Sequence, residues 1–144
     1  MEVEGTIGFT EALLIKRLKE LTDAAESIQT IAHWVIFYRK RHAALSVEIW
    51  ERELQLTGAE RKLTFVYLAN EIIQTSRRKG TEFLAPFALV LPAAIRHIYQ
   101  TTPPSVHDAI MRTITIWEQR QVYSPRFCND LRFALTPAGI PVAP

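Results

Sequence analysis

The chain has 144 residues, of which 48% are apolar and 22% are charged, and its formal net charge is +2. This length allows one domain with a sizeable core, and the small net charge does not mark the whole molecule as a binder of polyanions. The single cysteine, Cys128, excludes an internal disulfide and a metal site built from several cysteines, and no apolar run reaches the ~18 residues that a membrane-spanning helix needs.

The first half of the chain shows helical patterns and no strand-type alternation of convincing length. Thr10 is expected to cap a first helix, and Ser27 is expected to cap a second helix whose apolar residues recur about every 3.6 positions. The pattern predicts a third helix from about Ala43 to Leu56, which we expect Gly58 to end. A fourth helix is predicted within residues 62–80.

Prolines punctuate the second half of the chain. A fifth helix is predicted over roughly residues 82–100, in which Pro92 should kink or split the helix. Ser105 is expected to cap a sixth helix, and Ser124-Pro125 to start a seventh that ends near Leu135. Seven helices with short connections and no evident repeat period predict an all-α fold, either an irregular bundle or a right-handed superhelical stack of helix pairs.

The end of the sequence differs in composition from the rest. Residues 136–144 are rich in proline and cannot continue a helix. We therefore expect one domain over residues 1–135, followed by a linker over residues 136–144. Such a linker indicates a domain cut from a longer protein, whose C-terminal region is absent from this sequence.

A polar stripe follows the fourth predicted helix. Five side chains share the spacing i, i+3, i+4, i+7 and i+11, and they are Tyr67, Asn70, Glu71, Gln74 and Arg78. The apolar residues Phe65, Leu68, Ala69, Ile72 and Ile73 fall on the opposite side. A ring, two amides, a carboxylate and a guanidinium suit the recognition of an extended chain through stacking and hydrogen bonds. The alternative is an ordinary solvated helix face with a partly covered tyrosine, and the spacing alone leaves both open.

Two arginines of the sixth predicted helix form a second polar group. Arg112 and Arg120 are eight residues apart, so both can lie near one side of the helix. Arg112 stands in an otherwise apolar segment, where a guanidinium can bind a carboxylate or a phosphate through two hydrogen bonds. The alternative for Arg112 is an internal ion pair with a glutamate. The alternative for Arg120, near the helix end, is a capping contact or an ion pair.

Motifs for catalysis, metal binding and nucleotide binding are missing from the sequence. None of the four histidines stands three or four residues from another, and neither H-E-x-x-H nor G-x-S-x-G occurs. Five glycines are too few for a nucleotide cradle. We therefore expect no enzymatic activity, no catalytic residue, no cofactor and no metal site.

Several segments together resemble the RPR domain, which is also called the CID, the RNA polymerase II C-terminal-domain interacting domain. The segments are Ser27-Ile-Gln-Thr, Trp34, Arg39-Lys40, residues 62–80, Glu82-Phe83 and Ile116-Trp-Glu-x-Arg-x-Val-Tyr123. The resemblance covers approximately residues 8–135 and is strongest to the regulators of nuclear pre-mRNA and their fungal termination relatives.

The resemblance implies a right-handed superhelix of seven or eight helices and a nuclear protein that binds the phosphorylated tail of the polymerase's largest subunit. That tail repeats Tyr-Ser-Pro-Thr-Ser-Pro-Ser, and its binding couples transcription to elongation control, 3′-end processing or termination. By position, Tyr67, Asn70 and Glu71 contact the peptide, with Gln74 alongside. The family arginine that reads the serine phosphate aligns with Arg112, and Arg120 aligns with a later arginine.

The resemblance also implies polar contacts from the loop at Thr22 and Asp23, and three positions depart from the family pattern. Glu71 replaces a usual aspartate, and Thr75 replaces an asparagine, which removes an amide donor. Asp23 places a negative charge where an asparagine is common, and this charge should repel a nearby phosphate. Which serine phosphate is preferred therefore stays open.

Two other functions stay open at this stage. Helical trafficking adaptors of the ENTH or VHS type share the superhelical architecture and bind lipid head groups or sorting peptides, but the acidic residues 1–5 do not suit membrane binding. A weak contact with RNA through Arg77, Arg78 and Lys79 is the third hypothesis. We expect no membrane partner and a monomeric domain, whereas dimerisation of a full-length protein would raise avidity for a repetitive tail.

Overall fold

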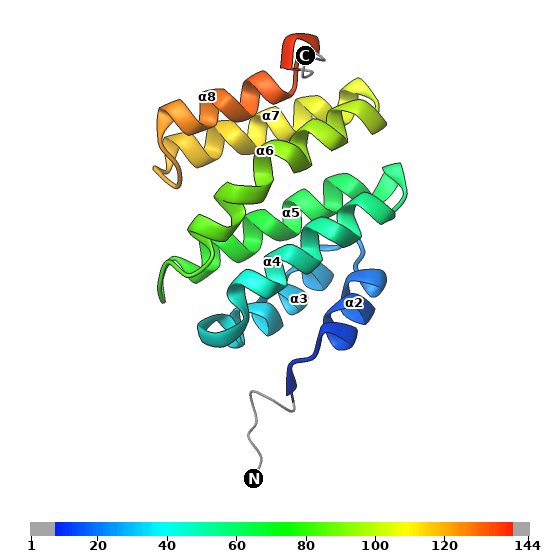
Figure 1. Cartoon of the computed structure of the whole chain (residues 1–144), viewed down its shortest axis with the longest axis vertical. Helices are drawn as coiled ribbons and strands as arrows, with labels where there is room; N and C mark the ends of the chain where they lie inside the picture. The colour runs from blue at the N-terminus through cyan, green and yellow to red at the C-terminus, as the bar shows by residue number, and fades with distance from the viewer. Residues whose placement is uncertain (1–7, 140–144) are drawn as a thin grey trace, which may run out of the picture.

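The computed structural model of the protein describes residues 8–139, which fold into a stack of α-helices that advances along the chain (Figure 1). The helices are α2 (Glu11–Glu20), α3 (Ala25–Phe37), α4 (Arg39–Leu56), α5 (Ala59–Ser76), α6 (Leu84–Thr101), α7 (Pro104–Gln119) and α8 (Pro125–Ala134), followed by a short 3-10 helix, η1 (Pro137–Gly139). No strand occurs within residues 8–139. The predicted all-α superhelical stack is confirmed.

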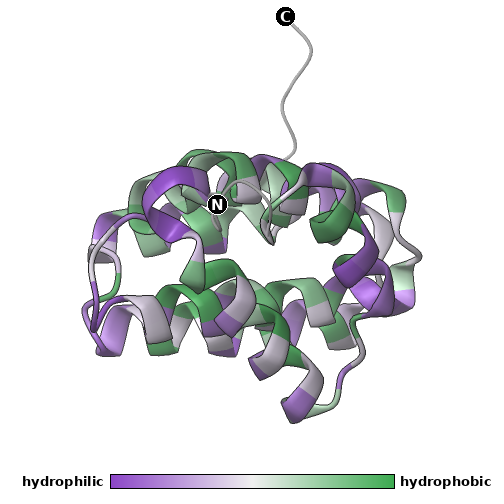
Figure 2. Cartoon of the chain, turned by 90° about the horizontal axis from the view of Figure 1, so that it is seen from below, coloured by the Kyte–Doolittle hydropathy of each residue, from purple (hydrophilic) through white to green (hydrophobic). Residues whose placement is uncertain are grey.

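Each helix carries both hydrophobic and hydrophilic residues along its length (Figure 2), so each helix can bury one face and leave another in solvent. The predicted apolar side of α5 is buried, because Phe65, Leu68, Ala69, Ile72 and Ile73 are all at most 3% exposed. These residues belong to one continuous core shared by all seven helices. The helix α5 therefore lies at the centre of the fold, with one polar side left over.

The predicted cap at Thr10 and the predicted helix start at Ser124-Pro125 are confirmed. The hydroxyl of Thr10 accepts a hydrogen bond from the backbone N–H of Leu13, and that of Ser124 accepts one from Phe127. Pro125 occupies the first turn of α8, as predicted.

Other local signals gave wrong boundaries. The helix α3 begins at Ala25, so the Ser27 hydroxyl lies inside the helix and accepts a hydrogen bond from the N–H of Thr22 at 3.0 Å. Pro104 starts α7 ahead of Ser105. Gly58 is the residue that precedes α5, and α4 begins at Arg39 rather than near Ala43.

The sequence predicts that Pro92 kinks or splits its helix. The helix α6 contains Pro92 without being split, and its ribbon changes direction near its middle (Figure 1).

Arg61 joins the end of α2 to the start of α5. Its Nη2 donates to the carbonyl oxygens of Leu18 at 2.8 Å and Leu21 at 2.6 Å, and its Nη1 donates to the hydroxyl of Thr57 at 2.8 Å. The guanidinium also lies over the ring of Phe65, 5.6 Å from its centroid. The last carbonyls of a helix often lack a partner. The carbonyl of Leu18 already accepts from the N–H of Leu21, so the arginine adds a second donor there and provides a donor for the carbonyl of Leu21.

Lys62 and His97 form a partly buried polar contact between α5 and α6. Lys62 is 4% exposed, and its Nζ donates to the carbonyl oxygen of Leu54 at 2.9 Å and lies 3.0 Å from Nε2 of His97. The imidazole is therefore neutral and accepts the second hydrogen bond. Burial and then the Lys62 charge lower the pKa of His97, while Glu51 opposes the shift.

We expect Arg61→Ala to lower the free energy of unfolding by about 2–3 kcal/mol, because several hydrogen bonds to a charged group are lost and the partly buried carbonyl of Leu21 loses its donor. Urea denaturation followed by circular dichroism measures this change. Arg52→Ala is the matched control, since its ion pair with Glu11 is exposed and should contribute about 1 kcal/mol or less. Equal losses in the two variants would contradict the role given to Arg61.

We expect acidification to weaken the fold through His97. Its pKa in the folded protein is below the unfolded value of about 6.5, so the unfolded chain binds the proton first. The stability that depends on neutral His97 is present above that pH and is lost as the pH falls through it toward the folded pKa. Urea denaturation from about pH 7.5 to about pH 5.5 should show a smaller loss for His97→Gln than for the wild type. The exposed His33 provides the control variant His33→Gln, which should keep the wild-type pH dependence.

Candidate functional site

Two hydrogen bonds between side chains hold α5 against α7. The indole Nε1 of Trp117 donates to Oδ1 of Asn70 at 2.8 Å, and Nη1 of Arg120 donates to Oε1 of Gln74 at 2.7 Å. The contacts advance along both helices together, from residue 70 to 74 and from residue 117 to 120, so α5 and α7 run in the same direction. The polar side of α5 therefore meets one flank of α7.

Asn70 is the centre of this contact. Its Oδ1 accepts hydrogen bonds both from Trp117, which is fully buried, and from Nε2 of Gln74 at 2.7 Å. The amide nitrogen of Asn70 makes no hydrogen bond to any residue of the described range, and it is not a buried atom. One end of this side chain is thus used for packing, and the other is available to donate to a ligand.

Two further groups of α5 keep unused hydrogen-bonding capacity. The Thr75 hydroxyl donates to Oε2 of Glu71 at 3.0 Å, which leaves Oε1 of Glu71 without a donor among residues 8–139. Tyr67 packs its ring against the core and is only partly buried. The structure therefore places a ring, an amide N–H and a carboxylate oxygen along one side of α5.

One flank of α7, together with the C-cap residue Arg120, carries a row of three residues at i, i+4 and i+8, namely Arg112, Ile116 and Arg120. Ile116 is 38% exposed, although it is a large apolar residue. It lines a surface hollow of about 550 Å³ on α7, and the other residues of this hollow are Asp108, Met111, Arg112 and Thr115. Sequence reasoning missed Ile116, and its position midway between the two arginines was the signal that could have found it.

The parallel register sets the level of Arg112 along the stack, close to the level of Tyr67. Arg112 lies five residues before Trp117, and Tyr67 lies three residues before Asn70, the partner of Trp117. Equal rise along two parallel helices puts Arg112 level with the turn of α5 that carries Tyr67. Arg112 is exposed and makes no ion pair or hydrogen bond within residues 8–139, so the internal ion pair considered for it is not formed there.

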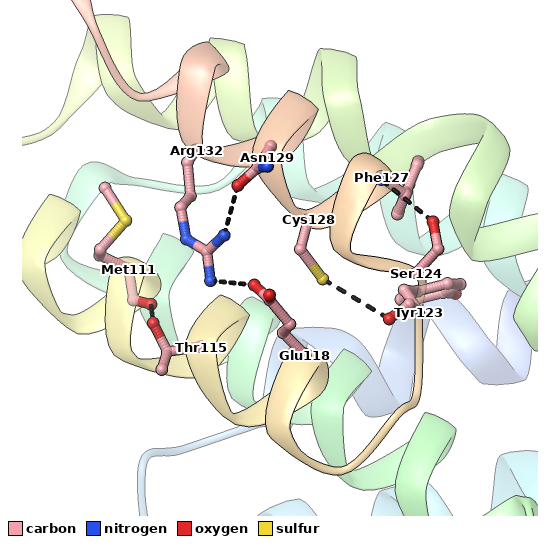
Figure 3. Close-up of polar contacts among 9 residues, drawn as sticks. All are labelled: Met111, Thr115, Glu118, Tyr123, Ser124, Phe127, Cys128, Asn129 and Arg132. Carbon is pink, nitrogen blue, oxygen red and sulfur yellow. Dashed lines mark hydrogen bonds and ion pairs between the residues drawn. The ribbon is translucent and has the colours of Figure 1, made fainter.

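Glu118 is turned away from this flank. Its carboxylate pairs with Nη2 of Arg132 on α8 at 2.6 Å, and Nη1 of Arg132 donates to Oδ1 of Asn129 at 2.7 Å (Figure 3). In the same view Cys128 is buried, with Sγ 3.9 Å from the carbonyl oxygen of Tyr123. Arg120 accordingly bonds the neutral amide of Gln74 rather than the glutamate on its own helix.

The remaining candidate residues lie outside this arrangement. Thr22 accepts a hydrogen bond from the N–H of Ala24 at 3.3 Å and lines a separate hollow of about 430 Å³, and Asp23 beside it is exposed. No hydrogen bond or ion pair joins this loop to α7 or to the polar side of α5 in the described part of the chain. Arg78 is exposed and follows the last residue of α5, Ser76.

Neither a metal centre nor a membrane span is found in the described range. No three side chains among its histidines, cysteines, aspartates and glutamates gather closely enough to hold a metal ion. None of the helices between residues 8 and 139 combines the length and the apolar character needed to cross a bilayer.

Comparison with known proteins identifies a single family. The family model described as the CID domain matches residues 12–131. The regulation of nuclear pre-mRNA domain-containing protein 1A of Gallus gallus is 45% identical over 127 residues, which are 88% of this chain and 47% of that protein. Protein 1B of Homo sapiens is 39% identical over 133 residues, which are 92% of this chain and 40% of that protein.

A solved structure shows the same fold. The CTD-interacting domain of Seb1 from S. pombe superposes with a TM-score of 0.77 at 15% sequence identity, covering 90% of this chain and 97% of that one. Our chain spans less than half the length of the curated relatives described above.

We expect Asn70→Ala to lower the free energy of unfolding by about 1–3 kcal/mol, because it leaves the buried indole N–H of Trp117 without an acceptor. Asn70→Asp keeps an acceptor oxygen in nearly the same place and should lose less. Urea denaturation of the two variants beside the wild type measures the difference. An equal loss in both would mean that the bond to Trp117 does not set the contact between α5 and α7.

Proposed function

The chain belongs to the CID domain family, and from this premise we propose that it binds the phosphorylated C-terminal tail of the largest subunit of RNA polymerase II. One observation carries the proposal. The polar side of α5, with Tyr67, Asn70 and Glu71, lies beside a flank of α7 that carries an exposed arginine without an ion-pair partner among residues 8–139, Arg112.

Each side chain has a task that its chemistry suits. The ring of a heptad tyrosine buries apolar area against Tyr67 and Ile116, while its hydroxyl donates to the unused carboxylate oxygen of Glu71. The amide nitrogen of Asn70 donates to a peptide carbonyl. The guanidinium of Arg112 forms two parallel hydrogen bonds to a serine phosphate next to that tyrosine.

In this proposal Gln74 and Arg120 mainly hold the two helices together. Their hydrogen bond, together with the one between Trp117 and Asn70, fixes the distance between the two helices before a ligand arrives. A preformed helix contact and a proline-rich peptide of restricted conformation both reduce the ordering cost of binding. The loop residues Thr22 and Asp23 would meet the peptide only where it continues beyond α5.

The expected affinity is modest. A charge-assisted contact to a phosphate contributes about 1.5–3 kcal/mol, and a short peptide on an open surface binds in the micromolar range, at roughly 8 kcal/mol or less. Repeated motifs on one tail, or two domains in one assembly, raise the effective affinity through avidity. This is the behaviour of a non-enzymatic adaptor that follows the phosphorylation state of the polymerase.

The cellular role follows from the same premise. Relatives are named for the regulation of nuclear pre-mRNA, and we place this chain in the nucleus, in elongation control, 3′-end processing or termination. The trafficking role of ENTH or VHS domains rests on shared architecture alone, and no feature of residues 8–139 favours it.

We expect Arg112→Ala to weaken binding of a singly phosphorylated two-repeat peptide between about tenfold and a hundredfold, which corresponds to one charge-assisted contact. Binding of the unphosphorylated peptide should change little. Fluorescence anisotropy with labelled peptides measures both affinities, and Lys16→Ala, which removes an exposed cation from α2, is the control. The proposal fails if the wild type binds all phosphorylated and unphosphorylated peptides equally, or if Arg112→Ala keeps full affinity for every phosphopeptide.

A further inference from the structure

Four cations gather where α5 and α7 end, and the function proposed above uses them only in part. The residues are Arg77, Arg78, Lys79 and Arg120, and all four are exposed. The two helices touch at this point, because Nη1 of Arg77 donates to the carbonyl oxygen of Arg120 at 3.4 Å. The run at 77–79 and the arginine of α7 therefore form one surface, which we call the basic end.

No carboxylate in the described range pairs with the basic end. Of the three that lie close to it in sequence, Glu82 lies 3.7 Å from Arg39, Glu118 pairs with Arg132, and Glu71 accepts from Thr75 through one oxygen. No ion pair within residues 8–139 involves any of the four cations.

A structural role explains only part of this charge. Cations favour the C-terminal ends of helices, where carbonyl groups carry partial negative charge. Only Arg77 contacts a carbonyl oxygen, and Arg120 uses its guanidinium on the neutral amide of Gln74. The guanidinium of Arg78 and the ammonium group of Lys79 make no hydrogen bond to any described residue. Both groups are therefore available to bind an anion.

The basic end continues the proposed binding surface of α5 and α7. Arg120 belongs to both, because it bonds Gln74 on the polar side of α5 and follows Arg112 by eight residues on α7. Eight residues of helix span ~12 Å, and the run at 77–79 extends the surface by about one more turn. An extended peptide covers ~3.3–3.6 Å per residue, so the basic end lies about three to five peptide residues away from Arg112.

We propose that the basic end is a second phosphate subsite, which takes a phosphate three to five residues away from the phosphate at Arg112 on the same peptide. This inference rests on the proposed function. A phosphoserine carries a charge of about −1.5 to −2 at neutral pH. A cluster of cations therefore attracts a phosphate more strongly than it attracts a carboxylate. Each contact is exposed and weak, but several together select the spacing of two phosphates.

The test compares three labelled two-repeat peptides by fluorescence anisotropy. The first carries one phosphate, the second carries two phosphates four residues apart, and the third carries two phosphates on neighbouring residues. The second peptide should bind about three- to tenfold more tightly than the first, as expected for a few exposed ion contacts. The third peptide controls for added charge and should gain less.

Variants locate the gain on the protein. Arg77→Ala/Lys79→Ala should abolish the advantage of the second peptide while changing the affinity for the first by less than about twofold, because these contacts are exposed and additive. The matched control Lys16→Ala/Lys19→Ala removes two exposed cations from α2 and should keep the advantage. Thermal unfolding by circular dichroism checks that both double variants remain folded.

The outcomes separate this inference from the function on which it rests. An equal affinity of the wild type for the first two peptides would overturn the second subsite and leave the function intact, provided that the single phosphate is still bound through Arg112. A wild type that binds no phosphopeptide would overturn both. A single-stranded RNA that displaces the second peptide more effectively than unlabelled peptide, and loses this effect in Arg77→Ala/Lys79→Ala, would assign the basic end to nucleic acid instead.

Discussion

The bond from the indole of Trp117 to the side chain of Asn70 is the constraint on which the contact between α5 and α7 depends. A fully buried N–H must find an acceptor, because leaving it unpaired costs more than a typical hydrogen bond contributes. The acceptor comes from another helix, so satisfying it fixes the point at which α7 meets α5, and the second bond between the helices sets their direction. That second bond, between Gln74 and Arg120, lies one turn further on.

The same bond leaves the two ends of the Asn70 side chain in different environments. The oxygen of Asn70 faces the core, and its nitrogen is left for a ligand. A residue held in this way has few alternative conformations, so binding does not need to order it. The polar side of α5 is therefore held in place by the core beneath it, while its outer surface is open to solvent.

Local patterns predicted the parts of the structure that depend on one helix at a time. The buried side of α5, the cap at Thr10 and the helix start at Ser124-Pro125 came from periodicity and from side chains close in sequence. Ser27 and Ser105 failed as caps, because the chain could start each helix earlier, at Ala25 and at Pro104. The stripe on α5 was visible in the sequence, but the partner of Asn70 and the place of Ile116 were not, since both depend on how two distant helices are aligned.

The hydrogen bonds from Arg61 to the end of α2 limit how this segment can change during evolution. The arginine binds carbonyl oxygens, which every amino acid possesses, so the side chains at Lys19 and Glu20 can vary without loss of the contact. An inserted or deleted residue, in contrast, would rotate those oxygens away from the guanidinium by about 100°. We therefore expect the length of this segment to be preserved among homologues more strictly than its composition.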